Sequence, residues 1–529
     1  MPVRHQHLTH RFDGGWAPGF GKLVSNLPTQ TSEVRIPYVL DAKNVFWTLD
    51  GGFKKIGGTS TVDIQLSTGD EVMGLFDYWR IGATGTHARR KIAHAGTTIY
   101  EDQGSSSWQA LGTGFTDGAH PNYCTFNDLL IVANDSTDVP YSWDQTTWQI
   151  LAGSPPNFSF AIEFKNRVWA AGATANPSRL YYCASGNPED WSGSGSGFID
   201  ISPGDGDEIR GLASFKNELW VFKGPYLGSI HRITGNTPSD FSRITFIEQL
   251  PCVSHSALIP FRDDFLFMTP SGSLRSLKAT AAFGDYNDAA LTFPINDWLI
   301  DNLNHAQLKK AWSVTDIANS LLYIAVPTGS STVNDTVLVY DYQFASIQKP
   351  DRWSRITDWN AHCLARVSVS GLPVIWGGGS DGYVRQLNIS SKNIDTTGKI
   401  SLAVDTPYLN YGSSVQHKTI NKVGITLSPQ GNDTVTFGWD RDTEHSQSIE
   451  LSQGDVTSEL GDAAAPAAGD FMLDESELGG LGFNEVYGDL DEGGDFRWIQ
   501  YKFRQAVLND DLRLHAFLTG VEFDAIGTE

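Results

Sequence analysis

The stretch Phe164-Lys165-Asn166-Arg167-Val168-Trp169 recurs 51 residues later as Phe215-Lys216-Asn217-Glu218-Leu219-Trp220. Each copy places a polar pair between an aromatic residue and an apolar run, which is typical of a tight turn followed by a buried strand. Looser copies begin at Phe126 and at Phe261. The chain therefore repeats one turn-and-strand unit several times.

A second repeated element follows the first, and in it a proline precedes an aromatic residue and a serine. Its copies are Pro188-Glu189-Asp190-Trp191-Ser192, Pro238-Ser239-Asp240-Phe241-Ser242 and Pro350-Asp351-Arg352-Trp353-Ser354. Repeats of about 40 to 50 residues that contain only short strands are typical of β-propeller blades. Repeat anchors lie near Arg90, Phe126, Phe164, Phe215, Phe261, Ile317 and Leu372. They predict about seven blades, give or take one.

Regular strand spacing also fits unrelated hairpins in a β-sandwich, and the two near-identical copies favour the propeller over that alternative. One helix is expected after Pro294, at residues 296–303, where apolar residues recur at helical spacing. The sequence thus predicts an all-β chain. Residues 1–62 form an N-terminal arm whose first strands close onto the propeller, residues 63–392 form the propeller, and residues 393–529 form a β-sandwich.

Composition narrows the function classes. The 529 residues include 12% aromatic residues and 53 glycines, a balance that suits many short strands joined by turns. A net charge of −23 argues against a broad surface that grips nucleic-acid phosphates, but it leaves room for a channel that repels DNA. We expect no secretory signal, because the N-terminus is polar, and no membrane-spanning helix, because no run of 18 apolar residues occurs.

About half of the net charge falls between Asp455 and Asp495, a stretch without Lys, Arg or His that we interpret as an acidic loop inserted in the sandwich. It is predicted either to be a solvated disordered loop or to line and narrow a channel as a gate. The gate candidates are its acidic residues: Asp455, Glu459, Asp462, Asp470, Asp474, Glu475, Glu477, Glu485, Asp489, Asp491, Glu492 and Asp495.

No motif predicts catalysis, a metal site or a cofactor. Asp205, Asp207 and Glu208 supply only part of a calcium loop, so a solvated turn between blades is expected there. Incomplete Asp boxes near Trp108 and Trp148 are interpreted as turn-stabilising hairpins. The four cysteines, Cys124, Cys183, Cys252 and Cys363, lack zinc-ligand spacing and are predicted to be buried thiols. We therefore expect a protein that is not an enzyme.

The N-terminus resembles a known family. Phe12-Asp13-Gly14-Gly15-Trp16 leads through Leu27-Pro28 to Ala42-Lys43-Asn44-Val45 and then to Leu49-Asp50-Gly51-Gly52-Phe53-Lys54-Lys55-Ile56-Gly57-Gly58. This string is similar to the start of the nozzle and tail-hub proteins of short-tailed phages, also called tail tubular protein B or packaged-DNA stabilisation proteins. The ending, residues 512–523, is similar to their closing strands.

The resemblance implies a structural virion protein that forms the distal tail channel, retains packaged DNA and conducts it during ejection. It implies a homo-oligomeric ring of six copies that contacts portal and adaptor ring proteins, carries tail fibres or spikes, and passes genomic DNA without specific binding. Assembly would take place in the host cytoplasm. Two alternatives stay open: a carbohydrate-binding or carbohydrate-cleaving propeller for host-surface recognition, marked by a cleft lined by Trp or Tyr with convergent carboxylates, and a monomeric cellular scaffold.

Overall fold

The computed structural model describes residues 4–12, 14–20, 22–24, 33–66, 69–81, 87–102, 107–262, 264–278, 290–344, 352–395, 397–428, 434–442, 445–452, 484–489, 495–507 and 511–523. These residues are mostly in β-strands and form two compact units. Unit 1 contains Met1–Gly58, Tyr340–Asp358 and Ile389–Glu529, and unit 2 contains Thr59–Val339 and Trp359–Asn388. Unit 2 is therefore inserted, in sequence, within unit 1.

Four sheets of unit 2 each consist of four antiparallel strands in sequence order. Their strands are β8 (Val72–Ile81), β9 (His87–Ala95), β10 (Thr98–Asp102) and β11 (Trp108–Thr113); β12 (Pro121–Phe126), β13 (Leu129–Asn134), β14 (Tyr141–Trp143) and β15 (Trp148–Ile150); β16 (Phe160–Glu163), β17 (Val168–Ala171), β18 (Arg179–Tyr182) and β19 (Gly197–Asp200); and β20 (Glu208–Phe215), β21 (Glu218–Gly224), β22 (Ser229–Thr234) and β23 (Ser242–Glu248).

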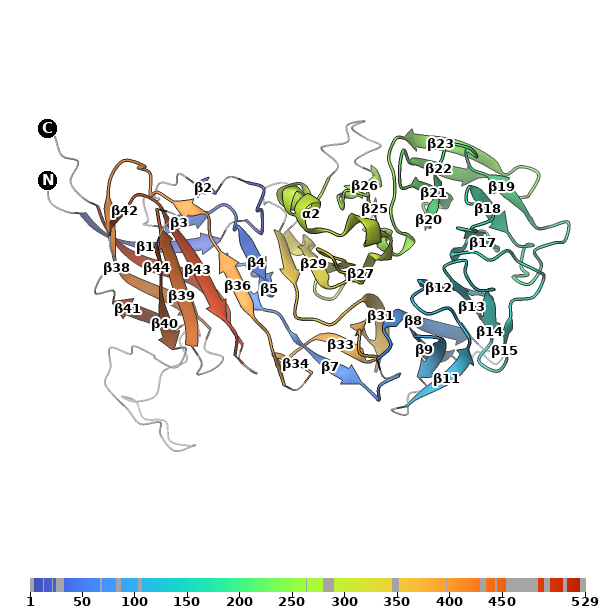
Figure 1. Ribbon diagram of the computed structural model, residues 1–529, viewed down its shortest axis with the longest axis horizontal. Coiled ribbons are helices and arrows are strands. Elements are labelled where there is room, and N and C mark those ends of the chain that lie inside the picture. Colours follow the sequence, from blue (N-terminus) through green and yellow to red (C-terminus); the bar gives the residue numbers. More distant parts are fainter. Residues whose placement is uncertain are drawn as a thin grey trace. The chain divides into compact units, whose positions relative to one another are not determined.

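A fifth sheet contains β24 (Ile259–Phe261), β25 (Asp264–Met268) and β26 (Leu274–Ser276), and a sixth contains β31 (Cys363–Val369), β32 (Leu372–Gly378) and β33 (Val384–Ile389). Strand β7 (Gly58–Val62) pairs with β33, so a strand from early in the chain completes the last of these sheets. Figure 1 shows the sheets following one another around a common centre. Among the described residues, this is a six-blade propeller-like arrangement.

The repeated sequence motif forms the turn that was predicted. Lys165 and Asn166 join β16 to β17, Lys216 and Asn217 join β20 to β21, and all four residues have positive φ angles. Two consecutive positive φ angles define the type I′ hairpin turn, in which asparagine is favoured. The indole Nε1 of Trp169 donates to the Phe164 carbonyl at 3.1 Å, and Trp220 makes the same bond to Phe215 at 3.2 Å. In each copy, the hydrogen bond from the tryptophan to the phenylalanine carbonyl thus stabilises the turn between them.

Between the fifth and sixth sheets the chain forms β27 (Trp312–Asp316), β28 (Leu321–Val326) and β29 (Thr336–Asp341). Before them lie η2 (Phe293–Ile295), α2 (Asn296–Asn302) and η3 (His305–Lys310), while η1 (His255–Ala257) precedes β24 and η4 (Tyr342–Phe344) follows β29. The expected helix after Pro294 is confirmed as α2. A seventh blade stays a prediction.

Unit 1 contains strands from both ends of the chain. One sheet has the order β3-β1-β44-β38-β41, and β42, β5 and β6 attach to it. Its strands are β1 (Arg4–Phe12), β3 (Glu33–Ile36), β5 (Val45–Trp47), β6 (Phe53–Lys55), β38 (Lys418–Leu427), β41 (Asn484–Asp489), β42 (Asp495–Phe496) and β44 (Arg513–Phe523). Because β1 pairs antiparallel with β44, this unit needs residues from both ends of the sequence.

Six further strands of unit 1 neighbour one another in the order β2 (Leu23–Val24), β37 (Tyr408–Leu409), β43 (Ile499–Gln505), β36 (Leu402–Asp405), β4 (Asp41–Lys43) and β30 (Arg352–Ile356). Strand β39 (Thr434–Arg441) also pairs with β43, and β40 (His445–Ser452) pairs with β39. A short hairpin contains β34 (Asn393–Ile394) and β35 (Gly398–Lys399). Rings of Phe503 and Phe437 contact Phe517 of β44 at centroid distances of 5.2 and 5.9 Å, so the two sets of strands share an aromatic core. The predicted domain boundaries and the sandwich stay predictions.

Two glycines of the N-terminal string are explained by packing in unit 1. A Cβ on Gly15 would lie 2.7 Å from the Cα of Arg352, and a Cβ on Gly52 would lie 1.9 Å from the carbonyl oxygen of Leu514. Only glycine permits backbones to approach so closely. Trp16, next to the first glycine, is fully buried. Among the described helices, none has the length and apolar character needed to cross a membrane.

Candidate functional site

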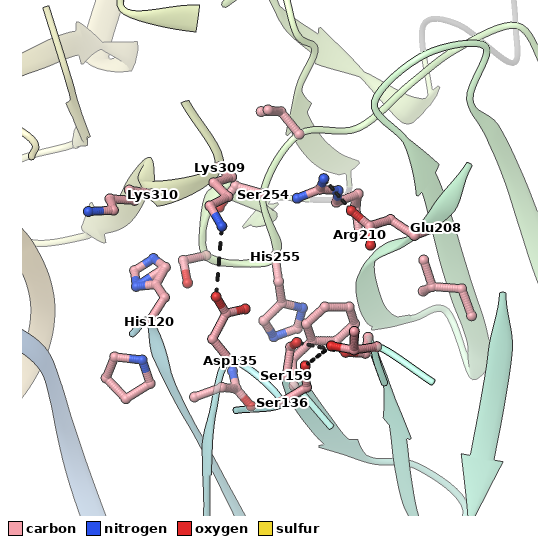
Figure 2. Close-up of a pocket in the computed structure, with 18 of the residues that line it drawn as sticks. His120, Asp135, Ser136, Ser159, Glu208, Arg210, Ser254, His255, Lys309 and Lys310 are labelled. Carbon is pink, nitrogen blue, oxygen red and sulfur yellow. Dashed lines mark hydrogen bonds and ion pairs between the residues drawn. The ribbon is translucent and has the colours of Figure 1, made fainter. Parts of the chain in front are cut away.

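A cavity of about 250 Å³ lies within unit 2, and its walls come from the segments that lead into successive blades. Figure 2 shows the side chains around it. The residues that line it are Gly118, His120, Pro121, Asn122, Asp135, Ser136, Ser159, Phe160, Gly172, Thr174, Glu208, Ile209, Arg210, Val253, Ser254, His255, Ser256, Lys309 and Lys310. Several of them, such as His120, Ser159 and Glu208, lie at or next to the first residue of a blade's first strand.

His255 forms part of the cavity wall through a fixed ring. The ring stacks on Phe160 with a centroid distance of 4.7 Å and an interplanar angle of 6°. Its Nδ1 accepts the backbone N–H of Leu212 at 3.2 Å, so a neutral His255 carries its proton on Nε2. Burial lowers the pKa of His255 to about 4, and the neighbouring His120 lowers it further in the same direction. The ring is therefore neutral near pH 7.

His120 lies on another wall of the cavity (Figure 2). Its ring meets Trp312 edge to face at 4.9 Å, and its Nε2 is buried without a hydrogen-bond partner. Burial lowers the pKa of His120 to about 4, although the charge of Asp135 acts in the opposite direction. A buried ring nitrogen without a partner is costly, so a hydrogen-bonding ligand would stabilise this side of the cavity.

The two carboxylates of the cavity each have a basic partner. Asp135 Oδ2 lies 3.8 Å from Lys309 Nζ, and Glu208 forms an ion pair with Arg210. Both pairs are drawn with dashed lines in Figure 2. The Nε of Arg210 is buried without a partner. The cavity can thus offer N–H donors to a polar ligand, while its carboxylates are already engaged with cations.

A second, smaller cavity of about 20 Å³ shares Gly118, His120 and Lys310 with the first. His362 Nδ1 and Glu71 Oε1 are 2.6 Å apart on its wall. Asn334 donates from Nδ2 to the carbonyls of Lys310 at 2.8 Å and His362 at 2.6 Å. Its volume fits one water molecule and no larger ligand.

The carboxylates singled out in the sequence do not converge. Asp205 accepts from Lys223 Nζ at 2.7 Å through both oxygens. Asp207 accepts the backbone N–H groups of Tyr226 at 2.8 Å and Gly228 at 2.6 Å. Both residues therefore hold turns, and Glu208 alone of the three reaches the cavity. Among the described residues, no three His, Cys, Asp or Glu side chains are grouped to hold a metal ion.

The four cysteines are buried and unpaired in disulfides, as predicted. Burial raises the pKa of Cys124 and of Cys252 to about 12. The thiols therefore stay protonated and unreactive at neutral pH.

Most of the gate candidates lie outside the described residues: Asp455, Glu459, Asp462, Asp470, Asp474, Glu475, Glu477, Asp491 and Glu492. Glu485 and Asp489 are part of strand β41, which pairs with β38. Asp495 begins β42 and accepts from the hydroxyl of Thr419 at 2.8 Å. Residues 484–489 and Asp495 of the acidic segment thus belong to strands.

The residues of the cavity were not found from the sequence. The signal that points to them is the repeat register, since His120, Ser159 and Glu208 lie at or just before the first strand of three successive sheets. In a propeller these strand ends gather around the axis, whatever their residue type. Comparison with models of known protein families and with curated proteins finds no match for this chain.

Proposed function

We propose that this chain is a structural protein of a tailed bacteriophage that forms the distal tail channel, retains packaged DNA and conducts it during ejection. One observation carries the proposal: three residues of the family-like N-terminal string, Gly15, Trp16 and Gly52, serve packing. Gly15 and Gly52 permit close backbone contacts, and Trp16 fills the core of unit 1. A string constrained by packing is what a structural family would preserve.

The finer architecture belongs to the same proposal. In addition to the six blades, β27–β29 form a seventh, and the two sets of strands in unit 1 form a β-sandwich. The seventh blade is supported by the lining of the cavity. Lys310, two residues before β27, lines the same cavity as His120 and Ser159, which directly precede the first strands of two blades. The sandwich is supported by the shared aromatic core around Phe517.

In the assembled tail, six copies close into a ring that contacts portal or adaptor ring proteins and carries fibres or spikes. Such a ring can close when every subunit binds its two neighbours through the same two different surfaces. The net charge of −23 supports passage of genomic DNA without binding, because like charges on a channel wall oppose adhesion. The acidic segment narrows that channel as a gate.

The alternative is a propeller that binds or cleaves carbohydrate, and the cavity of unit 2 does not favour it. Its lining includes Phe160 but neither Trp nor Tyr. Its two carboxylates, Asp135 and Glu208, are each paired with a cation. A glycosidase instead needs one carboxylic acid and one carboxylate across the bond to be cleaved. We therefore propose that the chain is not a glycosidase.

The experiment is native mass spectrometry and negative-stain electron microscopy of the purified chain, together with immunogold labelling of phage particles from the same source. We expect closed rings with cyclic symmetry and label confined to the tail tip. A chain that remains monomeric in purified virions would contradict the proposal. Turnover of a polysaccharide that is lost in Glu208→Gln or Asp135→Asn would instead support the carbohydrate alternative.

The gate is tested separately by deleting residues 455–483, which leaves strand β41 in place. Particles with the shortened chain should assemble but lose packaged DNA or eject it aberrantly. Unchanged DNA retention and infectivity would show that the acidic segment is not a gate.

A further inference from the structure

Three side chains from distant parts of the sequence form a hydrogen-bonded row in unit 1. Ser428 Oγ lies 2.7 Å from His515 Nε2. The other ring nitrogen of His515, Nδ1, is hydrogen-bonded to Asp50 Oδ2. A hydroxyl, an imidazole and a carboxylate in this order are the three groups of the Ser-His-Asp triad, which is recognised by geometry and not by sequence position.

The Asp-Gly-Gly part of the N-terminal string explains how Asp50 reaches His515. The turn between β5 and β6 contains Gly51 at φ +84°, a conformation that favours glycine. A Cβ on Gly52 would lie 1.9 Å from the Leu514 oxygen and 2.9 Å from the Cα of His515. The turn therefore lies directly against β44, and Asp50 is held beside the imidazole.

The electrostatics suit a carboxylate that orients the histidine. Burial raises the pKa of Asp50, but hydrogen bonds involving Thr48 and His515 outweigh burial, so the net pKa lies below its usual value. Asp50 is thus ionised near pH 7 and accepts the Nδ1 proton of His515. The Nε2 lone pair is then left for the hydroxyl proton of Ser428. The His515 side chain is only 9% exposed, which keeps the ring in one orientation.

A cavity of about 310 Å³ opens beside Asp50 and His515, two members of this row. It is lined by Thr9, Arg11, Asp50, Thr426, His515, Ala516 and Leu518. The volume accommodates a small organic ester. Thr9, Thr426 and Arg11 contribute polar side chains to its lining.

We propose that Ser428, His515 and Asp50 form a hydrolytic site for small carboxylic esters. Ser428 Oγ bonds to the ester carbonyl carbon while its proton moves to His515 Nε2. The carbon–oxygen bond to the leaving alcohol then breaks, and His515 returns the proton to that alcohol. Water attacks the acyl-serine through the same imidazole, which releases the carboxylic acid and restores the Ser428 hydroxyl.

The chain contains a matched control for this proposal. Ser229 Oγ lies 2.8 Å from His231 Nε2, so a second serine–histidine pair has the same spacing. The Nδ1 of His231 is buried without a partner, whereas the Nδ1 of His515 is bonded to a carboxylate. Ser229 and His231 are both buried, so burial as well as the missing carboxylate predicts an unreactive Ser229, and labelling of Ser428 is the decisive result.

The first experiment treats the full-length chain with a fluorophosphonate probe and identifies the labelled peptide by mass spectrometry. Labelling forms an Oγ–P bond and expels fluoride, and the hydroxyl proton leaves through His515. We expect the label on Ser428 and none on Ser229. A folded chain that takes no label on Ser428, or takes it equally on Ser229, would overturn the proposal.

The second experiment measures hydrolysis of p-nitrophenyl acetate. Ser428→Ala should reduce turnover to the rate of nonspecific acetylation, and Asp50→Asn should reduce it by about 10³- to 10⁴-fold, the effect of losing the orienting carboxylate in a triad. Ser229→Ala should leave turnover unchanged. If Ser428→Ala retains the wild-type rate, hydrolysis does not need the Ser428 hydroxyl and the proposal is wrong.

Discussion

His10 makes the stability of unit 1 sensitive to acid. Its ring is fully buried in β1 and stacks on Phe517 at a centroid distance of 4.2 Å and an angle of 11°. Its Nε2 is 3.0 Å from the hydroxyl of Tyr411, and its Nδ1 is buried without a hydrogen-bond partner. Burial lowers the pKa of His10 to about 3, although the backbone near Phe517 acts in the opposite direction. Only the neutral ring fits this core.

The sign and size of the effect follow from linkage. In the unfolded chain His10 titrates near 6.5, so the folded state binds a proton less readily than the unfolded state. The stabilisation is complete above pH 6.5 and is lost as the pH falls toward 3. At about 1.4 kcal/mol per pH unit, roughly 2 kcal/mol is lost between pH 6.5 and pH 5, and about 5 kcal/mol by pH 3.

The perturbation is His10→Phe, which keeps an aromatic ring in the stack and removes the titrating group. Hydrogen exchange of peptides from β1 and β44, measured at pH 6.5 and pH 5 and corrected for intrinsic rates, reports the local free energy of opening. The wild-type value should fall by about 2 kcal/mol more than that of the variant. The exposed His305→Gln serves as a control and should behave like the wild type. Equal losses in the wild type and His10→Phe would refute the reasoning.

Three further predictions follow from packing and burial. Gly52→Ala should destabilise unit 1 by about 3 kcal/mol or more, because its Cβ would collide with the Leu514 carbonyl; a melting curve like that of Gly195→Ala, whose Cβ would meet its nearest atom at 3.4 Å, would contradict this. Lys223→Met should lower the free energy of unfolding by about 2 kcal/mol, because the fully buried Lys223 ammonium pairs with the partly exposed Asp205 and donates to the carbonyls of Ile201 and Ser202. An unchanged denaturant midpoint would be inconsistent with that role. At pH 8 a thiol reagent should not modify Cys124 or Cys252 in the native chain, because both thiols are buried and protonated, but it should modify both in denaturant. Rapid labelling of the native chain would show that these thiols are accessible.

Local chemistry made part of the fold predictable. The Lys165-Asn166 and Lys216-Asn217 pairs predict hairpin turns because asparagine tolerates positive φ, and both turns form as expected. The helix at residues 296–302 follows from helical spacing of apolar residues. Each of these signals is complete within a dozen residues, so no long-range information is needed to use them.

Long-range pairing could not be predicted in the same way. Strand β1 pairs with β44, more than 500 residues away, and neither strand carries a local mark of its partner. The cavity of unit 2 has the same cause, because His120 and His255 meet through the closure of the blade-like sheets and not through spacing along the chain. Asp50, Ser428 and His515 are likewise brought together only by the sheet of unit 1.

The acidic segment shows how a strong compositional signal can hide a weaker structural one. Its charge predicts a solvated loop throughout, yet residues 484–489 form β41, and Lys422 of β38 is in register with Asp489. A test of the proposed gate should therefore delete residues 455–483 and keep β41, because removal of β41 would expose an edge of β38 and confound any effect on DNA.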